Sequence, residues 1–196
     1  GCRHIAGNCA YEPVYTAEDA NGLYKQLKEV SRYVIENKWD VAIGMLDEQV
    51  GGGEKNDRNY CGGTGAMLAF APDGSAYPCI RYAPISVGKE KADKVCLGNV
   101  TEGGLYATEQ QRKVKEELDA ITMKSQSTRE CIECPVSSGC GWCSGLNYDL
   151  YGTANKRCTN ICMAHKARVL AVCWYCNARS LAMGDMEPKK VNLPYE

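Results

Sequence analysis

Hydrophobic residues recur at three- and four-residue steps between residues 17 and 37, which predicts an amphipathic helix. Thr16, followed three residues later by Asp19, provides a capping signal at its start. Residues 2–10, of which 3–5 are the best part, and the short continuous apolar run at 41–46 flank this helix, and we expect both to form strands. Together they predict one strand–helix–strand unit. One face of the helix carries an apolar stripe of Ala20, Leu23, Leu27, Val30 and Val34.

The pattern changes after residue 50. A polar, glycine-led stretch at 51–58 is typical of a linker. Two β-prone runs at 66–71 and 76–79 then flank a Pro-Asp-Gly turn. They predict a hairpin whose second strand carries Cys79.

The remaining chain is expected to alternate between loops and helices. We predict a loop at 81–94 and a short strand and turn at 96–100. Apolar periodicity predicts helices at 105–124 and 159–183, and 184–196 is expected to be a polar tail. The buried stripe of the first of these helices would comprise Leu105, Val114, Leu118 and Ile121.

These elements predict an α+β fold in two parts, with residues 1–50 separate from a cysteine-rich part at 59–183. The net charge is −1 and the charges are interspersed, which argues against a nucleic-acid partner. No apolar stretch approaches the roughly 20 residues of a membrane span, and the start has no signal-peptide pattern. We therefore expect a cytoplasmic protein without a membrane partner.

Cysteine is the unusual component, with 13 in 196 residues. A chain of this length can bury a core without disulfides, and an odd number of cysteines cannot all pair. In a reducing compartment, clustered thiols indicate metal binding. The sequence has only two histidines, His4 and His165, which favours sites made entirely of thiolates. We interpret His165 as a hydrogen-bonded histidine rather than a ligand.

Four thiols follow the spacing C-x2-C-x5-C-x2-C between residues 131 and 143. A gap of two residues lets two sulfurs converge on one centre, so this segment predicts zinc or an iron–sulfur cluster. Cys96 is equally consistent with a ligand and with a small buried residue. Cys173 and Cys176 share a helix face within an apolar run, and we interpret them as core residues.

The cysteine spacings resemble those of a known family. Cys61-x12-Gly74-x4-Cys79 is similar to the opening of the SPASM motif, an auxiliary-cluster domain of many radical SAM enzymes. The second half of that motif is C-x2-C-x5-C-x3-C and a later cysteine. Cys131, Cys134 and Cys140 match its first three positions, Cys143 comes one residue early, and Cys158 and Cys162 compete for the last. The resemblance covers residues 59–176.

The resemblance implies two [4Fe–4S] clusters. The first would be held by Cys61, Cys79 and Cys143. Its fourth ligand would be Cys96 or Cys158, or would be missing, which would leave an iron open to a substrate thiolate. The second cluster would be held by Cys131, Cys134, Cys140 and Cys162, with Cys158 as the alternative to Cys162.

Residues 1–50 resemble the last strand–helix–strand of the radical SAM partial (β/α) barrel. The sequence lacks the C-x3-C-x2-C motif that holds the cluster at which S-adenosylmethionine is cleaved. The resemblance thus implies the auxiliary part of a peptide maturase, not active alone, whose N-terminal barrel would bind S-adenosylmethionine. Its substrate would be a ribosomal precursor peptide containing cysteine, modified for example by thioether crosslinking. No catalytic residue is assigned.

Two other functions fit the thiols. One is a zinc-stabilised interaction module, in which Cys131, Cys134, Cys140 and Cys143 hold one structural ion. It leaves Cys61 and Cys79 without a role. The other is a free-standing ferredoxin-like electron carrier, which would not need the strand–helix–strand start.

Overall fold

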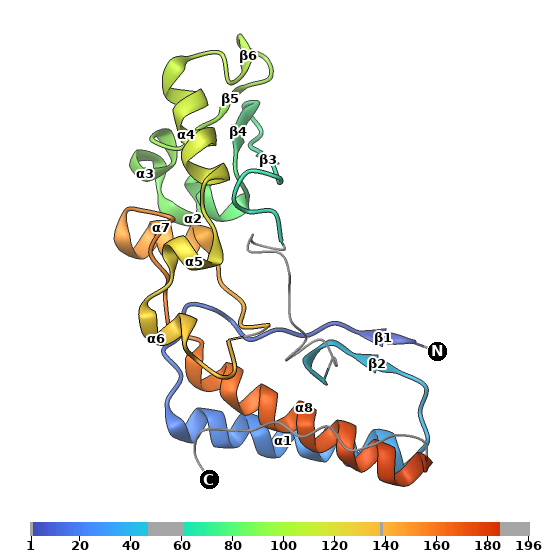
Figure 1. Cartoon of the computed structure of the whole chain (residues 1–196). Helices are drawn as coiled ribbons and strands as arrows, with labels where there is room; N and C mark the ends of the chain where they lie inside the picture. Colours follow the sequence, from blue (N-terminus) through green and yellow to red (C-terminus); the bar gives the residue numbers. More distant parts are fainter. Residues whose placement is uncertain (1, 47–60, 138, 185–196) are drawn as a thin grey trace. The chain divides into compact units, whose positions relative to one another are not determined.

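The computed structural model describes residues 2–46, 61–137 and 139–184 (Figure 1). The predicted linker at 51–58, and the predicted tail beyond residue 184, lie outside these ranges. The described residues form two compact units. We call the unit containing 2–46, 133–137, 139–141 and 159–184 the helix-pair unit, and the unit containing 61–132 and 142–158 the sheet unit.

The helix-pair unit begins with the predicted strand–helix–strand. Strand β1 (His4–Ile5) pairs in parallel with β2 (Ala42–Ile43), and helix α1 (Ala17–Glu36) lies between them in sequence. Both strands are shorter than predicted, because a short 3-10 helix, η1 (Gly44–Leu46), takes the end of the second apolar run. The βαβ prediction is confirmed for this part of the chain.

Helix α1 starts where its capping signal predicts. The Thr16 hydroxyl accepts a hydrogen bond from the backbone N–H of Asp19, and the Asp19 carboxylate accepts one from the Thr16 N–H. Most of the predicted stripe is buried or half-buried, but Val30 is 41% exposed, so the prediction is wrong for that residue. The neighbouring Ser31 is buried instead, and its hydroxyl donates a hydrogen bond to Leu27 O at 2.7 Å.

Helix α8 (Cys162–Met183) lies side by side with α1, and both run in the same direction (Figure 1). Near their starts, the Tyr15 N–H donates to Asn160 O at 3.2 Å. Further along, the Lys28 ammonium lies 5.0 Å from the ring centre of Trp174. The shared core of these elements consists of Leu27, Val34, Leu46, Ala171 and Tyr175.

The sheet unit contains a four-stranded antiparallel sheet in the order β3-β4-β5-β6. The strands are β3 (Ala69–Phe70), β4 (Ser75–Tyr77), β5 (Gly98–Asn99) and β6 (Gly104–Leu105). The hairpin and the short strand near residue 98 are thereby confirmed. Cys79 follows β4 rather than lying on it.

Short helices replace two of the predicted features. The expected loop at 81–94 is wrong, because it contains most of η2 (Ile80–Tyr82) together with α2 (Pro84–Val87) and α3 (Lys89–Asp93). The single helix expected at 105–124 is also wrong. Thr108 and Thr122 each cap a new helix, which separates α4 (Glu109–Asp119) from α5 (Met123–Gln126). Two more short helices follow, α6 (Arg129–Ile132) and α7 (Ser144–Tyr151).

The core of the sheet unit joins the sheet to these helices. Val114, Leu118 and Ile121 are buried as predicted, whereas Leu105 belongs to β6 and is only half-buried. Across the described ranges, helices and two small sheets combine, so the protein is α+β. No helix in the described part of the chain has both the length and the apolar character that a membrane crossing needs.

Candidate metal centres

All thirteen cysteines are thiols rather than disulfides. The predicted ligands form two groups. The first thiol group, Cys61, Cys79 and Cys143, lies entirely in the sheet unit. The second thiol group, Cys134, Cys140 and Cys162, lies entirely in the helix-pair unit.

A glycine-rich turn positions Cys61. The Gly62 carbonyl accepts hydrogen bonds from Ala66 N–H at 3.0 Å and Met67 N–H at 2.9 Å, and Gly62 has a φ of 76°, which favours glycine. The buried Ser144 hydroxyl donates to Gly63 O at 2.9 Å, although the two residues are 81 apart in sequence. This bond ties the Cys61 turn to the residue that follows Cys143.

Cys143 and Cys79 each precede the first residue of a helix. Cys143 is the N-cap of α7, and its Sγ accepts a hydrogen bond from Leu146 N–H at 3.4 Å. Cys79 is the N-cap residue of η2, with an extended backbone. The two helices approach closely at Gly145, where an added Cβ would lie 2.4 Å from the Cβ of Arg81. A glycine at this position therefore allows the two N-cap cysteines to come together.

Electrostatics link the three thiols of the first group. Burial raises the pKa of the Cys79 thiol, and hydrogen bonding from Arg81 N–H opposes this rise. The neighbouring thiols of Cys143 and Cys61 raise the same pKa further. The Cys79 thiol is therefore influenced by both of the other thiols of the first group. A bound cationic centre would relieve this repulsion and favour the thiolate forms.

A buried tyrosine follows Cys79 in the core of the sheet unit. Tyr82 is 0% exposed, and its N–H donates to Cys79 O at 3.0 Å. Burial raises the pKa of Tyr82, a side-chain hydrogen bond with Ser144 opposes this rise, and the thiols of Cys79, Cys143 and Cys61 add to it. Ser144, which also donates to Gly63 O, therefore lies between this tyrosine and the Cys61 turn.

The two protein candidates for a fourth ligand have other neighbours. The Cys96 thiol lies 3.5 Å from Gly98 O, and it adds to the rise in the pKa of Tyr77 that burial causes. Cys158 is buried, and its backbone N–H donates to Asn147 Oδ1 at 2.8 Å. Neither contact distinguishes the alternatives, so the fourth ligand stays a prediction.

Local turns bring the loop cysteines of the second thiol group together. Ser137 N–H donates to Cys134 O at 3.0 Å, and Cys140 N–H donates to Ser137 O at the same distance. At the end of this loop, an added Cβ on Gly141 would lie 2.2 Å from the Tyr11 hydroxyl oxygen. The loop therefore folds on itself and packs closely against the segment that leads into α1.

The same loop is fixed to the first turn of α8. His165 is buried, and its Nε2 lies 2.6 Å from Val136 O, which confirms its interpretation as a hydrogen-bonded histidine. Cys162 is the first residue of α8, where the helix dipole stabilises a thiolate. Cys131, the remaining predicted ligand of this centre, belongs to α6 in the sheet unit.

Neither thiol group, as the structure describes it, has the arrangement of side chains that would bind a single metal ion. Among the described residues, no set of three or more His, Cys, Asp or Glu side chains could hold one metal ion as it stands. Four sulfurs around zinc would be about 3.8 Å apart, from a tetrahedron with Zn–S bonds of about 2.3 Å. A four-iron cage carries its thiolates on different irons and so holds them further apart.

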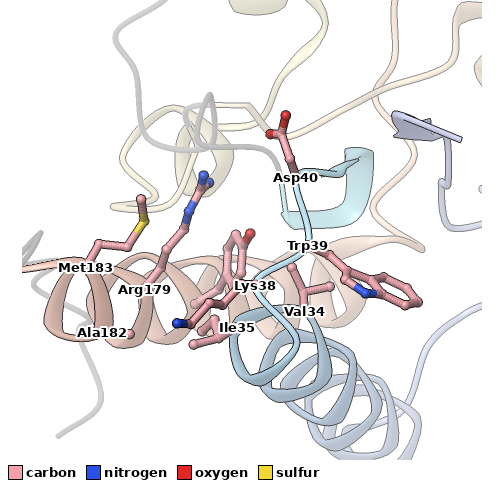
Figure 2. Close-up of a pocket in the computed structure, with 9 residues that line it drawn as sticks. Val34, Ile35, Lys38, Trp39, Asp40, Arg179, Ala182 and Met183 are labelled. Carbon is pink, nitrogen blue, oxygen red and sulfur yellow. The ribbon is translucent and has the colours of Figure 1, made fainter. Parts of the chain in front are cut away.

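A hollow in the helix-pair unit is an alternative candidate for a binding site. It has a volume of about 410 Å³ and lies between the C-terminal ends of α1 and α8 (Figure 2). Apolar side chains line it together with Lys38, Asp40 and Arg179. No cysteine is among the described residues that line it, so it offers no soft ligand for iron or zinc.

The sequence interpretation missed Ser144 and Gly145, which hold the segments around Cys61, Cys79 and Cys143. Their signals are weak, because serine and glycine beside cysteines are common in loops. Comparison with known proteins adds no family to this geometry: no protein-family model matches the sequence, and no curated protein matches it.

Proposed function

We propose that this chain is the auxiliary iron–sulfur part of a radical SAM enzyme that modifies a ribosomally made peptide. Its role would be to transfer electrons and to position the substrate, for example while the enzyme forms a thioether crosslink. The main support is the hydrogen bond from the Ser144 hydroxyl to Gly63 O, which joins the turn after Cys61 to the residue that follows Cys143 although they are far apart in sequence. The resemblance of their spacing to the SPASM motif adds to it.

Each residue has a defined task in this proposal. Cys61, Cys79 and Cys143 would hold the first [4Fe–4S] cluster, which supplies a one-electron acceptor when bound. The Leu146 N–H already donates to the Cys143 sulfur and would stabilise its thiolate. The side chains of Tyr82, Trp142 and Tyr148 are buried in the core of the sheet unit and would limit water access.

The second cluster would be held by the loop and by the start of α8. Cys134, Cys140 and Cys162 come from the helix-pair unit, and Cys131 would complete the set, with Cys158 as the alternative to Cys162. The turns at Ser137 shape this loop before any metal binds. S-adenosylmethionine would bind to an N-terminal barrel and not to the residues described here.

A zinc-stabilised interaction module is the second candidate, because the turns between Cys134 and Cys140 also suit a structural zinc loop. It would use Cys131 and Cys143 as well. Cys79 has no role in it. A free-standing electron carrier is less well supported, because the parallel pairing of β1 and β2 serves no purpose in a carrier.

Anaerobic reconstitution with iron and sulfide tests the proposal. The wild-type chain should become brown and bind about eight irons, four for each cluster. Cys79→Ser should lose about four of them, because it removes a ligand of the first cluster only. A colourless protein with one or two zinc ions, equally bound by Cys79→Ser, would instead support the interaction module.

A further inference from the structure

We propose that the hollow between the C-terminal ends of α1 and α8 binds a small molecule with an apolar body and one carboxylate, which Arg179 and Tyr175 recognise (Figure 2). All the described residues that line this hollow belong to the helix-pair unit, and none of them is a cysteine. The inference therefore does not depend on the proposed iron–sulfur function.

The hollow has the size and the lining of a small-molecule site. Its volume of about 410 Å³ falls within the usual range of ligand pockets. Val34 and Ile35, from the last turn of α1, give it an apolar wall, and Met183 of α8 adds to this wall. A smaller hollow of about 250 Å³ is also lined by Tyr175 and Arg179, so these two residues border both spaces. They are therefore placed to contact a ligand in either one.

Two hydrogen-bond donors at the hollow lack acceptors. Tyr175 is only 6% exposed, and its hydroxyl makes no hydrogen bond with any described residue. Arg179 is half-buried and makes no hydrogen bond or ion pair within the described part of the chain. Its guanidinium carbon lies 6.0 Å from the ring centre of Tyr175, so the two donors are neighbours. Because buried polar groups normally have a partner, this pair of donors indicates a ligand with an acceptor group.

The charges at the hollow favour an anionic acceptor. Lys38 and Arg179 line it together with one carboxylate, that of Asp40. Asp40 is exposed, so water and salt screen its charge, and it forms no ion pair with Arg179 among the described residues. Figure 2 shows the Arg179 and Asp40 side chains extending to the same side of the hollow. A ligand carboxylate matches the planar guanidinium and can also accept from the tyrosine hydroxyl.

Calorimetric titration of the full chain with phenylbutyrate and with phenylbutanol tests the inference, because these probes share an apolar body and differ in the carboxylate. The acid should bind about tenfold more tightly than the alcohol, as expected for a charge-assisted hydrogen bond at a half-buried site. Arg179→Gln should remove this difference by weakening only the acid. Tyr175→Phe should weaken the acid about threefold, since it removes one neutral donor and keeps the ring.

Two matched controls change the same groups outside the lining. Lys28→Gln removes a cation that lies 5.0 Å from the ring centre of Trp174 on the same helix pair. Tyr33→Phe removes the hydroxyl of a tyrosine that is 54% exposed. Neither residue is among those that line the hollow, so both variants should bind the acid as the wild type does.

A blocking substitution tests the place of binding without removing a polar group. Ala182→Trp starts from an exposed residue of the lining and should abolish binding of both probes by filling the hollow. Leu181→Trp, at the adjacent and 77% exposed position, should bind both normally. Equal affinity of the wild type for the two probes, no binding of either, or undiminished binding in Ala182→Trp would overturn the inference. Iron content tests the proposed function separately.

Discussion

The two thiol groups reach their arrangement by different physical routes. The first group joins residues far apart in sequence, and its assembly depends on buried contacts such as the Ser144–Gly63 hydrogen bond across 81 residues. Cys134 and Cys140 of the second group are joined by two successive turns. The first group should therefore be sensitive to packing changes in the sheet unit, and the second to changes in its own loop.

Loss of a loop ligand should have the largest effect. Cys134→Ala should lower iron content by about four and also lower the stability of the protein, because metal binding is coupled to folding of the loop. Iron assays and thermal unfolding measure both quantities. Cys173→Ala is the matched control, since Cys173 lies on α8 outside the predicted ligand set. Full iron retention in Cys134→Ala would contradict the second centre.

Gly145→Val should affect the first group without touching a ligand. The added side chain would meet the Cβ of Arg81 at 2.4 Å, and we expect a loss of about 3 kcal/mol, the upper end for overpacking. About four irons should be lost with it. Gly22→Ala is the control, because nothing lies within 4 Å of its added Cβ and an exposed helical glycine gains about 0.5–1 kcal/mol on this change. An iron content equal to that of the wild type in Gly145→Val would show that the metal centre does not depend on this contact between helices.

Ser144→Ala should have a smaller effect at the same place. It leaves the buried Gly63 carbonyl without its donor, which should cost about 1–2 kcal/mol in chemical unfolding. Cluster loss on dilution should become faster, because the Cys61 turn is held less firmly. Ser180→Ala removes a buried helical hydroxyl that donates to Cys176 O, and it should leave the rate of cluster loss unchanged. Equal rates in the two variants would argue against a role for Ser144 in positioning Cys61.

Thr16→Ala should have the smallest effect, about 1 kcal/mol, because it removes the N-cap of α1. Iron content should not change. Hydrogen bonds from Thr16 lower the pKa of the Asp19 carboxyl. The contribution of this pairing is therefore present above the ordinary carboxyl pKa of about 3.9 and is lost as the pH falls through the lowered value. The stability difference from wild type should shrink in that acidic range, and a constant difference would count against the pairing.

The sequence predicts the helix-pair unit better than the sheet unit, because its signals are local. Helix α1 spans 20 residues with a full capping box, so periodicity and capping both identify it. Helices α2, α3 and η2 have five residues or fewer, too few for a periodic pattern to emerge. The helix predicted from residue 105 does not begin there, because Tyr106 has a φ of 58°, outside the range of a right-handed helix. The pattern of apolar residues does not reveal this backbone angle.

The candidate ligands could be found from cysteine spacing, but their surroundings could not. Gly145 matters only because Arg81 lies against it, and Ser144 matters only because its hydroxyl donates to Gly63 O, 81 residues away in sequence. Both properties arise from contacts between distant segments. No spacing rule within one segment encodes them.

The most direct test of the first centre is an iron anomalous-difference map from crystals of the anaerobically reconstituted chain. We predict a strong peak bounded by the sulfurs of Cys61, Cys79 and Cys143. Iron located elsewhere, with Cys61 and Cys79 remote from it, would contradict the convergence of these three thiols on one cluster.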